Sequence, residues 1–237
     1  MARTPAGTPR FHRESDRTLL ARDGLDNLDT LFDRFMPEKT RHAGRHVTAT
    51  RLADGTQVFV KLQHGRQRLL PTMRELRDGR FFRSIPENEW NGLCLLRSAG
   101  LDAAEPMAVF RSGRLHFRSA IIIRAVPAPE SIHEMIRGGA WDELGTDDRK
   151  HLRLGMAETV RTIHRAGLGW AGIAAKHLYP AAGNDGSWKL WLIDCEGVHG
   201  SATRATYLRD LAKLRESLKR SGADTATLGM LEDPLPD

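Results

Sequence analysis

The stretch that decides the fold reads IHRAGLGWAGIAAKHLYPAAGNDGSWKLWLIDCEG, from Ile163 to Gly197. Its pattern predicts the end of a helix, a loop, a short strand, a turn and a buried strand. The buried strand, WKLWLI at residues 188–193, is apolar apart from Lys189 and ends at Asp194. Cys195, Glu196 and Gly197 follow the acid directly, so the strand delivers a carboxylate to a turn.

A carboxylate at the end of a buried strand, beyond a helix end that carries a histidine, is the layout of a phosphoryl-transfer site. Such a site also needs a loop that holds a proton acceptor for the attacking hydroxyl. The loop in that position reads Gly169-Trp170-Ala171-Gly172 and offers no base. The pattern therefore predicts the carboxylate of such a site, at Asp194, but contains no residue that could act as its base.

Length and composition set the class of protein. A chain of 237 residues with 40% hydrophobic and 28% charged residues can bury a core, as one domain or two small lobes. We expect no transmembrane segment, because no apolar run approaches the roughly 18 residues that a membrane span needs. The polar N-terminus lacks the apolar core of a signal peptide, and Cys94 and Cys195 form neither a disulfide framework nor a metal-ligand spacing. We expect a cytoplasmic protein with free thiols.

The positive charge is concentrated in the first part of the chain. Residues 1–86 hold 17 of the 36 Lys and Arg but only 10 of the 30 Asp and Glu. This excess favours phosphates, anionic lipid surfaces or nucleic acid, or it is solvated surface arginine. The basic segment 64–83 carries six arginines, but no helix-turn-helix, zinc or aromatic platform accompanies it, so we expect no specific nucleic-acid partner.

The first half of the chain predicts mainly strands. Residues 1–20 are polar and rich in Pro and charge, and we expect them to be disordered. A short amphipathic helix is expected within residues 21–35, and a hairpin of strands 47–52 and 57–62 around Asp54-Gly55. Lys61 shares one face of the second strand with Phe59, so it is either exposed or directed into a cleft.

After the hairpin the predicted elements change from strand to helix. A helix over residues 87–100 carries Glu89 beside its apolar stripe, and strands are expected at 107–110 and 119–124. A proline-bearing linker at 125–130 precedes the helical part. The remaining predicted elements are helices at 131–137, 147–166 and 202–221, with a flexible tail at 223–237. Strands followed by a hinge and helices predict two lobes.

The order of these features resembles the protein-kinase-like fold, and in detail the lipopolysaccharide kinase family (Kdo and core-heptose kinases), most closely its InaA-type members. The resemblance implies an α+β, compact and truncated two-lobed fold. Its small N-lobe of antiparallel strands plus one helix would span residues 21–126, and its mainly helical C-lobe residues 127–222. The motifs that carry the resemblance are ARDGLDNLDTLF at 21–32, VKLQ at 60–63, NEW at 88–90, IHRAGL at 163–168, KHL at 176–178, LIDCE at 192–196 and RDL at 209–211.

The resemblance implies roles for individual residues. Lys61 would neutralise the phosphates of ATP and Glu89 would hold that lysine by an ion pair. Asp194 would bind Mg²⁺, and His177, in the slot where typical kinases place asparagine, would assist the metal or a phosphate. The aligned catalytic aspartate is replaced by Gly172. The expected cofactors are therefore ATP and Mg²⁺, with the catalytic base absent.

Four further positions match the family less directly. Asp210 stands where a helix acid braces the catalytic loop, and Lys176 is either a phosphate contact or an exposed lysine. No G-x-G-x-x-G loop is present, so Gly44 would offer the backbone approach to phosphate. Glu196 is the nearest candidate for a substitute base.

Two functions follow from the resemblance. The first is ATP-dependent phosphorylation of a sugar in the lipopolysaccharide core, by a cytoplasmic protein peripheral to the inner membrane. The second is a pseudokinase, a scaffold or stress-response module in envelope biogenesis whose partner is another protein of that process. Because phosphoryl transfer depends chiefly on positioning and metal electrostatics, the loss of a base at Gly172 argues for slow or absent transfer.

Overall fold

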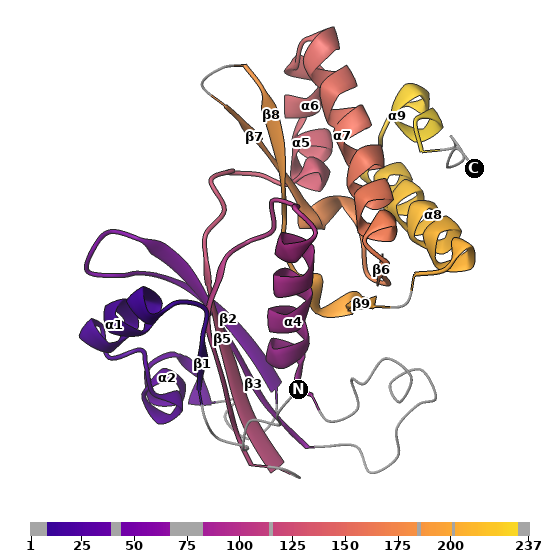
Figure 1. The fold of residues 1–237 in the computed structure, drawn as a ribbon. Helices are drawn as coiled ribbons and strands as arrows, with labels where there is room; N and C mark the ends of the chain where they lie inside the picture. Colours follow the sequence, from indigo (N-terminus) through magenta and orange to yellow (C-terminus); the bar gives the residue numbers. More distant parts are fainter. Residues whose placement is uncertain are drawn as a thin grey trace. The chain divides into compact units, whose positions relative to one another are not determined.

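The computed structural model describes residues 9–38, 44–66, 83–113, 116–183, 186–200 and 202–231 (Figure 1). The chain divides into two compact units. The first comprises Met1–Asn91 and Ala104–Ala125, and the second comprises Gly92–Ala103 and Val126–Asp237. Antiparallel strands in the first unit and mainly helices in the second confirm the predicted fold class. The first unit ends at Ala125, within the predicted linker at 125–130.

The first unit is built on one antiparallel sheet of five strands in the order β1-β4-β5-β3-β2. The two predicted strands at 107–110 and 119–124 are present and extend further than expected. The strands are β1 (Arg10–Phe11), β2 (Gly44–Arg51), β3 (Gln57–Arg66), β4 (Pro106–Ser112) and β5 (His116–Arg124).

The predicted hairpin is the pair of β2 and β3. Gly55 turns the chain with φ of 88°, a conformation that glycine adopts without strain. The carboxylate of Asp54 accepts a hydrogen bond from the backbone N–H of Thr56 at 2.9 Å, which closes the turn locally. The register then places Val47 opposite Lys61 and Ala49 opposite Phe59.

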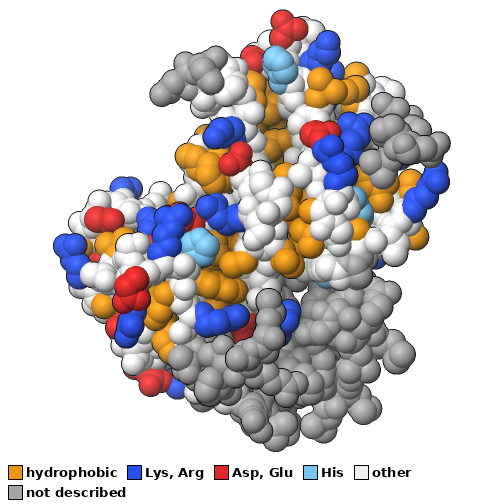
Figure 2. All heavy atoms as spheres, in the orientation of Figure 1, with side chains coloured by type: hydrophobic (Ala, Val, Ile, Leu, Met, Phe, Trp, Pro, Cys, Tyr) orange, Lys and Arg blue, Asp and Glu red, His pale blue; other side chains and the backbone are white. Residues whose placement is uncertain are grey.

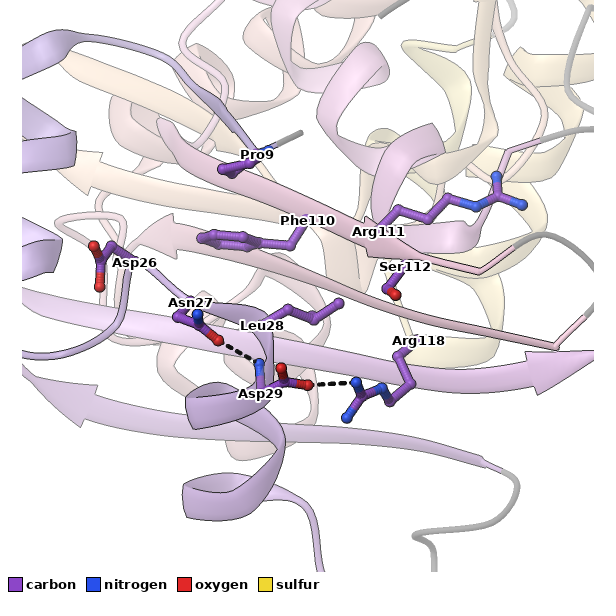
Figure 3. A pocket seen from close by; sticks show the side chains of 9 residues that line it. All are labelled: Pro9, Asp26, Asn27, Leu28, Asp29, Phe110, Arg111, Ser112 and Arg118. Atoms are coloured by element: carbon purple, nitrogen blue, oxygen red, sulfur yellow. Dashed lines mark hydrogen bonds and ion pairs between the residues drawn. The ribbon is translucent and has the colours of Figure 1, made fainter. Parts of the chain in front are cut away.

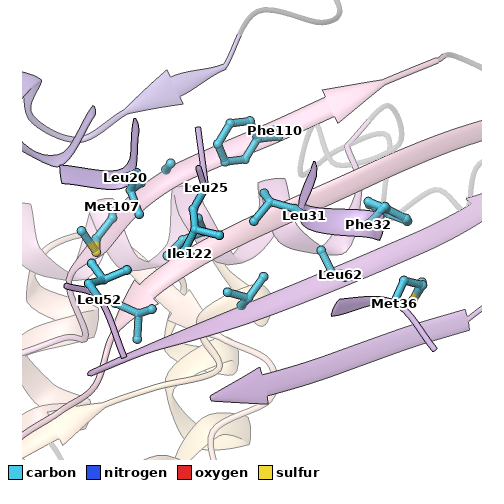
Figure 4. Close-up of a cluster of buried hydrophobic side chains, with 14 residues drawn as sticks. Leu20, Leu25, Leu31, Phe32, Met36, Leu52, Leu62, Met107, Phe110 and Ile122 are labelled. Carbon is cyan, nitrogen blue, oxygen red and sulfur yellow. The ribbon is translucent and has the colours of Figure 1, made fainter. Parts of the chain in front are cut away.

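The core of this unit lies between one face of the sheet and helices α1 (Glu14–Arg22) and α2 (Leu28–Phe35) (Figure 4). Because side chains alternate along a strand, Val58, Val60 and Leu62 enter this core while Phe59 and Lys61 face the other side. The helices contribute Leu20, Leu31 and Phe32, and strands β4 and β5 contribute Met107, Phe110, Ala120 and Ile122.

The expected disorder of residues 1–20 is wrong for the part that the structure describes. Residues 10–11 form β1 and residues 14–22 form α1, while residues 1–8 lie outside the described residues. Phe11 packs edge-to-face on Phe110 at 5.9 Å, and the buried carboxylate of Asp16 accepts a hydrogen bond from Arg124 Nη2 at 2.6 Å. Contacts with distant strands, which local composition does not reveal, order this segment.

The predicted helix within residues 21–35 is interrupted. Helix α1 ends at Arg22, Gly24 takes a left-handed conformation with φ of 66°, and α2 starts only at Leu28. The Asn27 side chain accepts a hydrogen bond from Asp29 N at 2.8 Å and caps α2. The segment expected to form one helix therefore contains the end of α1 and the whole of α2.

Helix α4 (Ile85–Ser98) starts two residues before the predicted helix, with Pro86 in its first turn, where a missing N–H costs no hydrogen bond. Gly100, with φ of 80°, follows shortly after its end at Ser98. Its first half belongs to the first unit and its second half, from Gly92, to the second unit.

The second unit contains the three predicted helices. They are α5 (Ile132–Gly138), α7 (Thr146–Arg165) and α8 (Arg204–Ser221), and a short α6 (Ala140–Glu143) lies between the first two. Ser131 and Glu134 form a capping box that fixes the start of α5 directly after the linker. The expected flexible tail contains helix α9 (Thr225–Gly229), while residues 232–237 lie outside the described residues.

The stretch from Ile163 to Gly197 contains the end of α7 and, together with the three residues that follow it, folds into small antiparallel strand pairs. Strand β6 (Leu168–Trp170) pairs with β9 (Val198–Gly200), and β7 (Leu178–Ala182) pairs with β8 (Trp188–Leu192). Two 3₁₀ turns, η2 (Ala175–His177) and η3 (Cys195–Gly197), connect them. Within the described ranges, every helix is too short or too polar to cross a bilayer.

Candidate functional site

In the first unit, Lys61 and Glu89 form an ion pair. Lys61 Nζ lies 2.6 Å from Glu89 Oε1, with the glutamate side chain 2% exposed and the lysine side chain 22% exposed. Lys61 is therefore not a freely exposed lysine, and that it is directed into a cleft stays a prediction. A charged pair this buried is expensive to desolvate and is weak evidence for stability, so a functional reason for its presence has to be considered.

The sheet face that carries Lys61 also exposes apolar side chains. Val47 is 54% exposed and Phe59 is 37% exposed, and the hairpin register places them with Ala49 on the same face as Lys61. In antiparallel pairs, directly opposed residues point to the same side of the sheet. Hydrophobic side chains reach the surface beside Lys and Arg at several places on the molecular face shown in Figure 2. A cation next to an apolar strip can receive a ligand that combines phosphate with a flat ring.

A pocket of about 230 Å³ lies elsewhere in the first unit (Figure 3). Both of its arginines are paired with carboxylates: Arg118 with Asp29, and Arg111 with Glu87 at 2.8 Å. These ion pairs neutralise both arginines, so the pocket offers little positive charge to an anionic ligand. The pocket contains none of the predicted site residues; its lining is Pro9, Asp26, Asn27, Leu28, Asp29, Phe110, Arg111, Ser112 and Arg118.

In the second unit, Asp210 of α8 holds the loop at β6. Its carboxylate is 1% exposed and accepts a hydrogen bond from the backbone N–H of Trp170 at 2.7 Å. His164 Nε2 lies 3.2 Å away, and Arg209 donates from Nη2 at 2.9 Å. The carboxylate thus joins α7, β6 and α8 at the point where the aligned catalytic loop begins, which is the bracing position that the family resemblance implies.

The charge on Asp210 is stabilised by these contacts. Burial alone raises the pKa of the Asp210 carboxyl, but hydrogen bonds from His164, Trp170 and Arg209 outweigh burial and lower the pKa below its usual value of 3.8. A carboxyl with a lowered pKa in the folded protein stabilises that state fully above its unfolded pKa. The stabilisation is lost as the pH falls through the folded pKa.

We therefore expect Asp210→Asn to destabilise the protein by about 1.5–3 kcal/mol at neutral pH, the range for hydrogen bonds to a charged group. The difference from the wild type should shrink as the pH falls below about 4, because the wild-type carboxyl is then protonated too. Urea denaturation of both proteins over a series of pH values measures this. A difference that is constant down to acidic pH would show that the charge of Asp210 contributes nothing.

Trp170 and His177 connect this loop to Asp194. The two rings stack with an interplanar angle of 17° and centroids 5.9 Å apart, and Trp170 is fully buried. His177 Nε2 lies 3.3 Å from Asp194 Oδ2, but the contact is poorly directed, and neither ring nitrogen of His177 makes a hydrogen bond within the described ranges. The structure therefore brings His177 and Asp194 together, as it does Lys61 and Glu89.

Asp194 has an unusual backbone. Its φ of 56° and ψ of 46° are left-handed, and among the described residues it is the one non-glycine residue with positive φ. Aspartate tolerates this region better than most residues, but such conformations are concentrated at functional sites. The conformation turns the chain from β8 into η3 and leaves the Asp194 side chain 39% exposed.

The side chains fit Mg²⁺ only in part. Among the described residues, no group of three His, Cys, Asp or Glu side chains could hold a metal ion alone. Mg²⁺ is commonly held by one or two carboxylates together with the phosphates of a nucleotide, and one exposed carboxylate at Asp194 suits that arrangement. The imidazole of His177 is a poorer donor for Mg²⁺, so its fit as a metal ligand is weaker.

Gly172 lies in the turn after β6, in the second unit. No positive φ requires glycine at this position, and a Cβ built there would have Trp170 Nε1 as its nearest neighbour, at 3.8 Å. That indole nitrogen is buried and has no hydrogen-bond partner in the described part of the chain. Neither backbone conformation nor lack of space explains the missing carboxylate. Of the other predicted positions, Glu196 is half-buried in η3, Lys176 is exposed in η2 and Gly44 begins β2.

A close contact between helix α4 and η3 was not predicted. A Cβ at Gly92 would lie 2.0 Å from the carbonyl oxygen of Cys195, a distance that no real contact tolerates. Glycine is thus required here because α4 packs directly on the backbone that follows Asp194. The Gly92-Leu93-Cys94 sequence within a helix pattern was the available signal, since an isolated helical glycine usually has a packing reason.

Other contacts in the second unit also escaped sequence reasoning. Lys213 donates from Nζ to the carbonyl oxygen of Ala171 at 2.5 Å, and His164 and Arg209 join Asp210. The IHRAGL and RDL motifs contain His164, Arg209 and Asp210, so the motif residues were visible. The sequence did not show that these three side chains converge on the loop at β6.

The fold is that of a protein-kinase-like protein. A model of the "Lipopolysaccharide kinase (Kdo/WaaP) family" matches residues 32–230, and the chain belongs to this family. A solved structure described as "WaaP in complex with acyl carrier protein" is similar, with a TM-score of 0.68 and 17% sequence identity over 96% of this chain and 90% of that chain. At this identity the likeness concerns the fold. No match was found among curated proteins.

Proposed function

We propose that this protein binds ATP with Mg²⁺ and is a lipopolysaccharide-kinase-like protein whose phosphate transfer is slow because Gly172 replaces the base. The observation that carries the proposal is the Lys61–Glu89 ion pair, buried on the glutamate side and partly open on the lysine side. An ion pair in this position in a kinase family directs an ammonium group to nucleotide phosphates. Family membership supports ATP as the phosphate donor.

Each residue has a defined task in this proposal. Lys61 neutralises phosphate charge, and Glu89 fixes the position of Lys61. The apolar strip of Val47, Ala49 and Phe59 offers a surface for the adenine ring of ATP. Asp194 supplies a carboxylate for the metal. Mg²⁺, when bound, neutralises charge that develops on the phosphates. The acceptor that the family indicates is a sugar hydroxyl of the lipopolysaccharide core at the inner leaflet, which makes the protein a peripheral one.

The test is thermal stabilisation by ATP with and without Mg²⁺. A nucleotide at a hundredfold excess over its Kd stabilises a protein by about 2.7 kcal/mol. For a chain of this size each kcal/mol raises the Tm by about 2–4 °C. We expect this shift in the wild type and its loss in Lys61→Ala, with each variant compared to itself without nucleotide. Lys189→Ala, which removes an exposed strand lysine of β8, is the matched control and should keep the shift. A wild type that does not respond to ATP would overturn the proposal.

The second candidate is a pseudokinase that acts as a scaffold or stress-response module in envelope biogenesis. Gly172 favours it, because glycine cannot accept the proton of an attacking hydroxyl. Stabilisation by ATP without phosphate transfer to core oligosaccharide would support this candidate. Transfer above the uncatalysed rate would exclude it.

A further inference from the structure

Helix α8 has two faces of different character. The buried face includes Tyr207, Leu211, Leu214 and Leu218, together with Asp210, which braces the β6 loop. All six basic residues of the helix lie outside this buried face, five of them exposed and Arg209 half-buried beside Asp210. They are Arg204, Arg209, Lys213, Arg215, Lys219 and Arg220.

The exposed face has little negative charge to balance these residues. Glu216 is the one acid on the outward side of this fully described helix, and it pairs with Arg220 at 2.9 Å. Arg209 is drawn toward Asp210 at 2.9 Å. Arg204 and Lys219 are both exposed, and Lys219 also interacts with the Glu216 carboxylate.

An apolar residue lies within this cationic face. Leu208 is 54% exposed, and it belongs to one stripe with Arg204, Arg215 and Lys219, because positions i, i+4, i+11 and i+15 recur on one side of a helix. At 1.5 Å per residue the stripe is about 22 Å long. Exposed leucine is common, but a leucine flanked by basic side chains along a helix has the composition of an interfacial helix.

We infer that the exposed face of α8 docks on an anionic lipid surface. A cluster of four to eight Lys and Arg on an amphipathic helix attracts anionic headgroups, and each charge adds to the binding. A lipid surface fits better than a folded acidic protein, because the cations follow the whole helix and do not surround one pocket. The inference rests on the proposed function, because a protein whose acceptor lies at the inner leaflet has to lie at that surface itself.

The experiment measures partitioning of the full chain onto vesicles of phosphatidylcholine, alone or with phosphatidylglycerol. The test variant is Arg204→Glu/Arg215→Glu/Lys219→Glu. The control, Arg17→Glu/Arg22→Glu/Arg51→Glu, changes net charge equally at exposed positions of the first unit. We expect the wild type and the control to bind phosphatidylglycerol vesicles, with affinity that falls with salt, and the test variant to bind at least about tenfold more weakly. Leu208→Ser should weaken binding at high salt, where the apolar contribution remains.

Several results would overturn the inference. The first is a wild type that does not bind anionic vesicles, and the second is an equal loss of vesicle affinity in the test and control variants. The third is a wild type that binds an acidic protein but not vesicles. Circular dichroism of the test variant excludes unfolding as the cause, and Arg204→Gln/Lys219→Gln offers a milder change if it is needed. The assay contains no nucleotide, so its failure is separate from a failure of ATP to stabilise the protein.

Discussion

Gly172→Asp should raise the rate of phosphate transfer to a core-oligosaccharide acceptor by about 10²–10⁴-fold, the usual contribution of a positioned general base. The structure makes this variant feasible. The backbone at Gly172 has no positive φ, and the first atom near a new Cβ is Trp170 Nε1 at 3.8 Å. The buried indole N–H, which lacks a partner among the described residues, is a ready donor for the new carboxylate.

Two companion variants separate the base from other effects of the substitution. Gly172→Asn has nearly the same shape without a basic carboxylate, and Gly172→Ala tests the loss of glycine alone. The measurement is transfer of labelled phosphate from ATP under single-turnover conditions, with nucleotide binding checked by thermal shift. Equal rates for Gly172→Asp and Gly172→Asn would show that the missing carboxylate is not what limits transfer.

Arg124→Met should destabilise the first unit by about 3–5 kcal/mol, the usual cost of breaking a buried ion pair from one side. The carboxylate of Asp16 is fully buried, and Arg124 Nη2 donates to its Oδ1 at 2.6 Å. Its other oxygen, Oδ2, has no hydrogen-bond partner within the described ranges. Removal of the guanidinium would therefore leave a buried carboxylate without compensation.

The control for this prediction lies in the same cluster. Arg13 pairs with Glu105 at 2.6 Å but is 53% exposed, so Arg13→Met should cost less than about 1 kcal/mol. The double variant Asp16→Leu/Arg124→Met removes both charges of this pair and should recover part of the loss, because Glu105 still loses its contact with Arg124 Nε at 3.2 Å. Chemical denaturation of the four proteins measures these differences. A single Arg124→Met variant as stable as Arg13→Met would contradict the prediction.

The sequence predicted those elements whose signals are local. Asp54-Gly55 between two β-rich runs specified the hairpin, and alternation along β3 separated Lys61 from the core-facing valines. Helices α5, α7 and α8 followed from hydrophobic spacing and from caps. The kinase-like order of Lys61, Glu89 and Asp194 came from resemblance, and the structure shows each within a defined contact.

Contacts between distant residues could not be predicted. Asp16 and Arg124 are 108 positions apart, and Trp170 and Asp210 are 40 apart. The polar composition of residues 1–20 therefore predicted disorder, although the few apolar side chains of this segment pack on the sheet. The contact of Gly92 with the Cys195 carbonyl is of the same kind, because only the packed backbones reveal why glycine stands there.

That contact also makes Cys195 a natural chemical reporter. Its thiol is fully buried next to Asp194, so a maleimide or a disulfide reagent can reach it only when η3 separates from its neighbours. In a Cys94→Ser variant, Cys195 is the one remaining thiol. Its labelling rate then measures how often the segment that carries Asp194 opens. A ligand that engages Asp194 would slow the labelling, which allows binding to be followed without an assay of phosphate transfer.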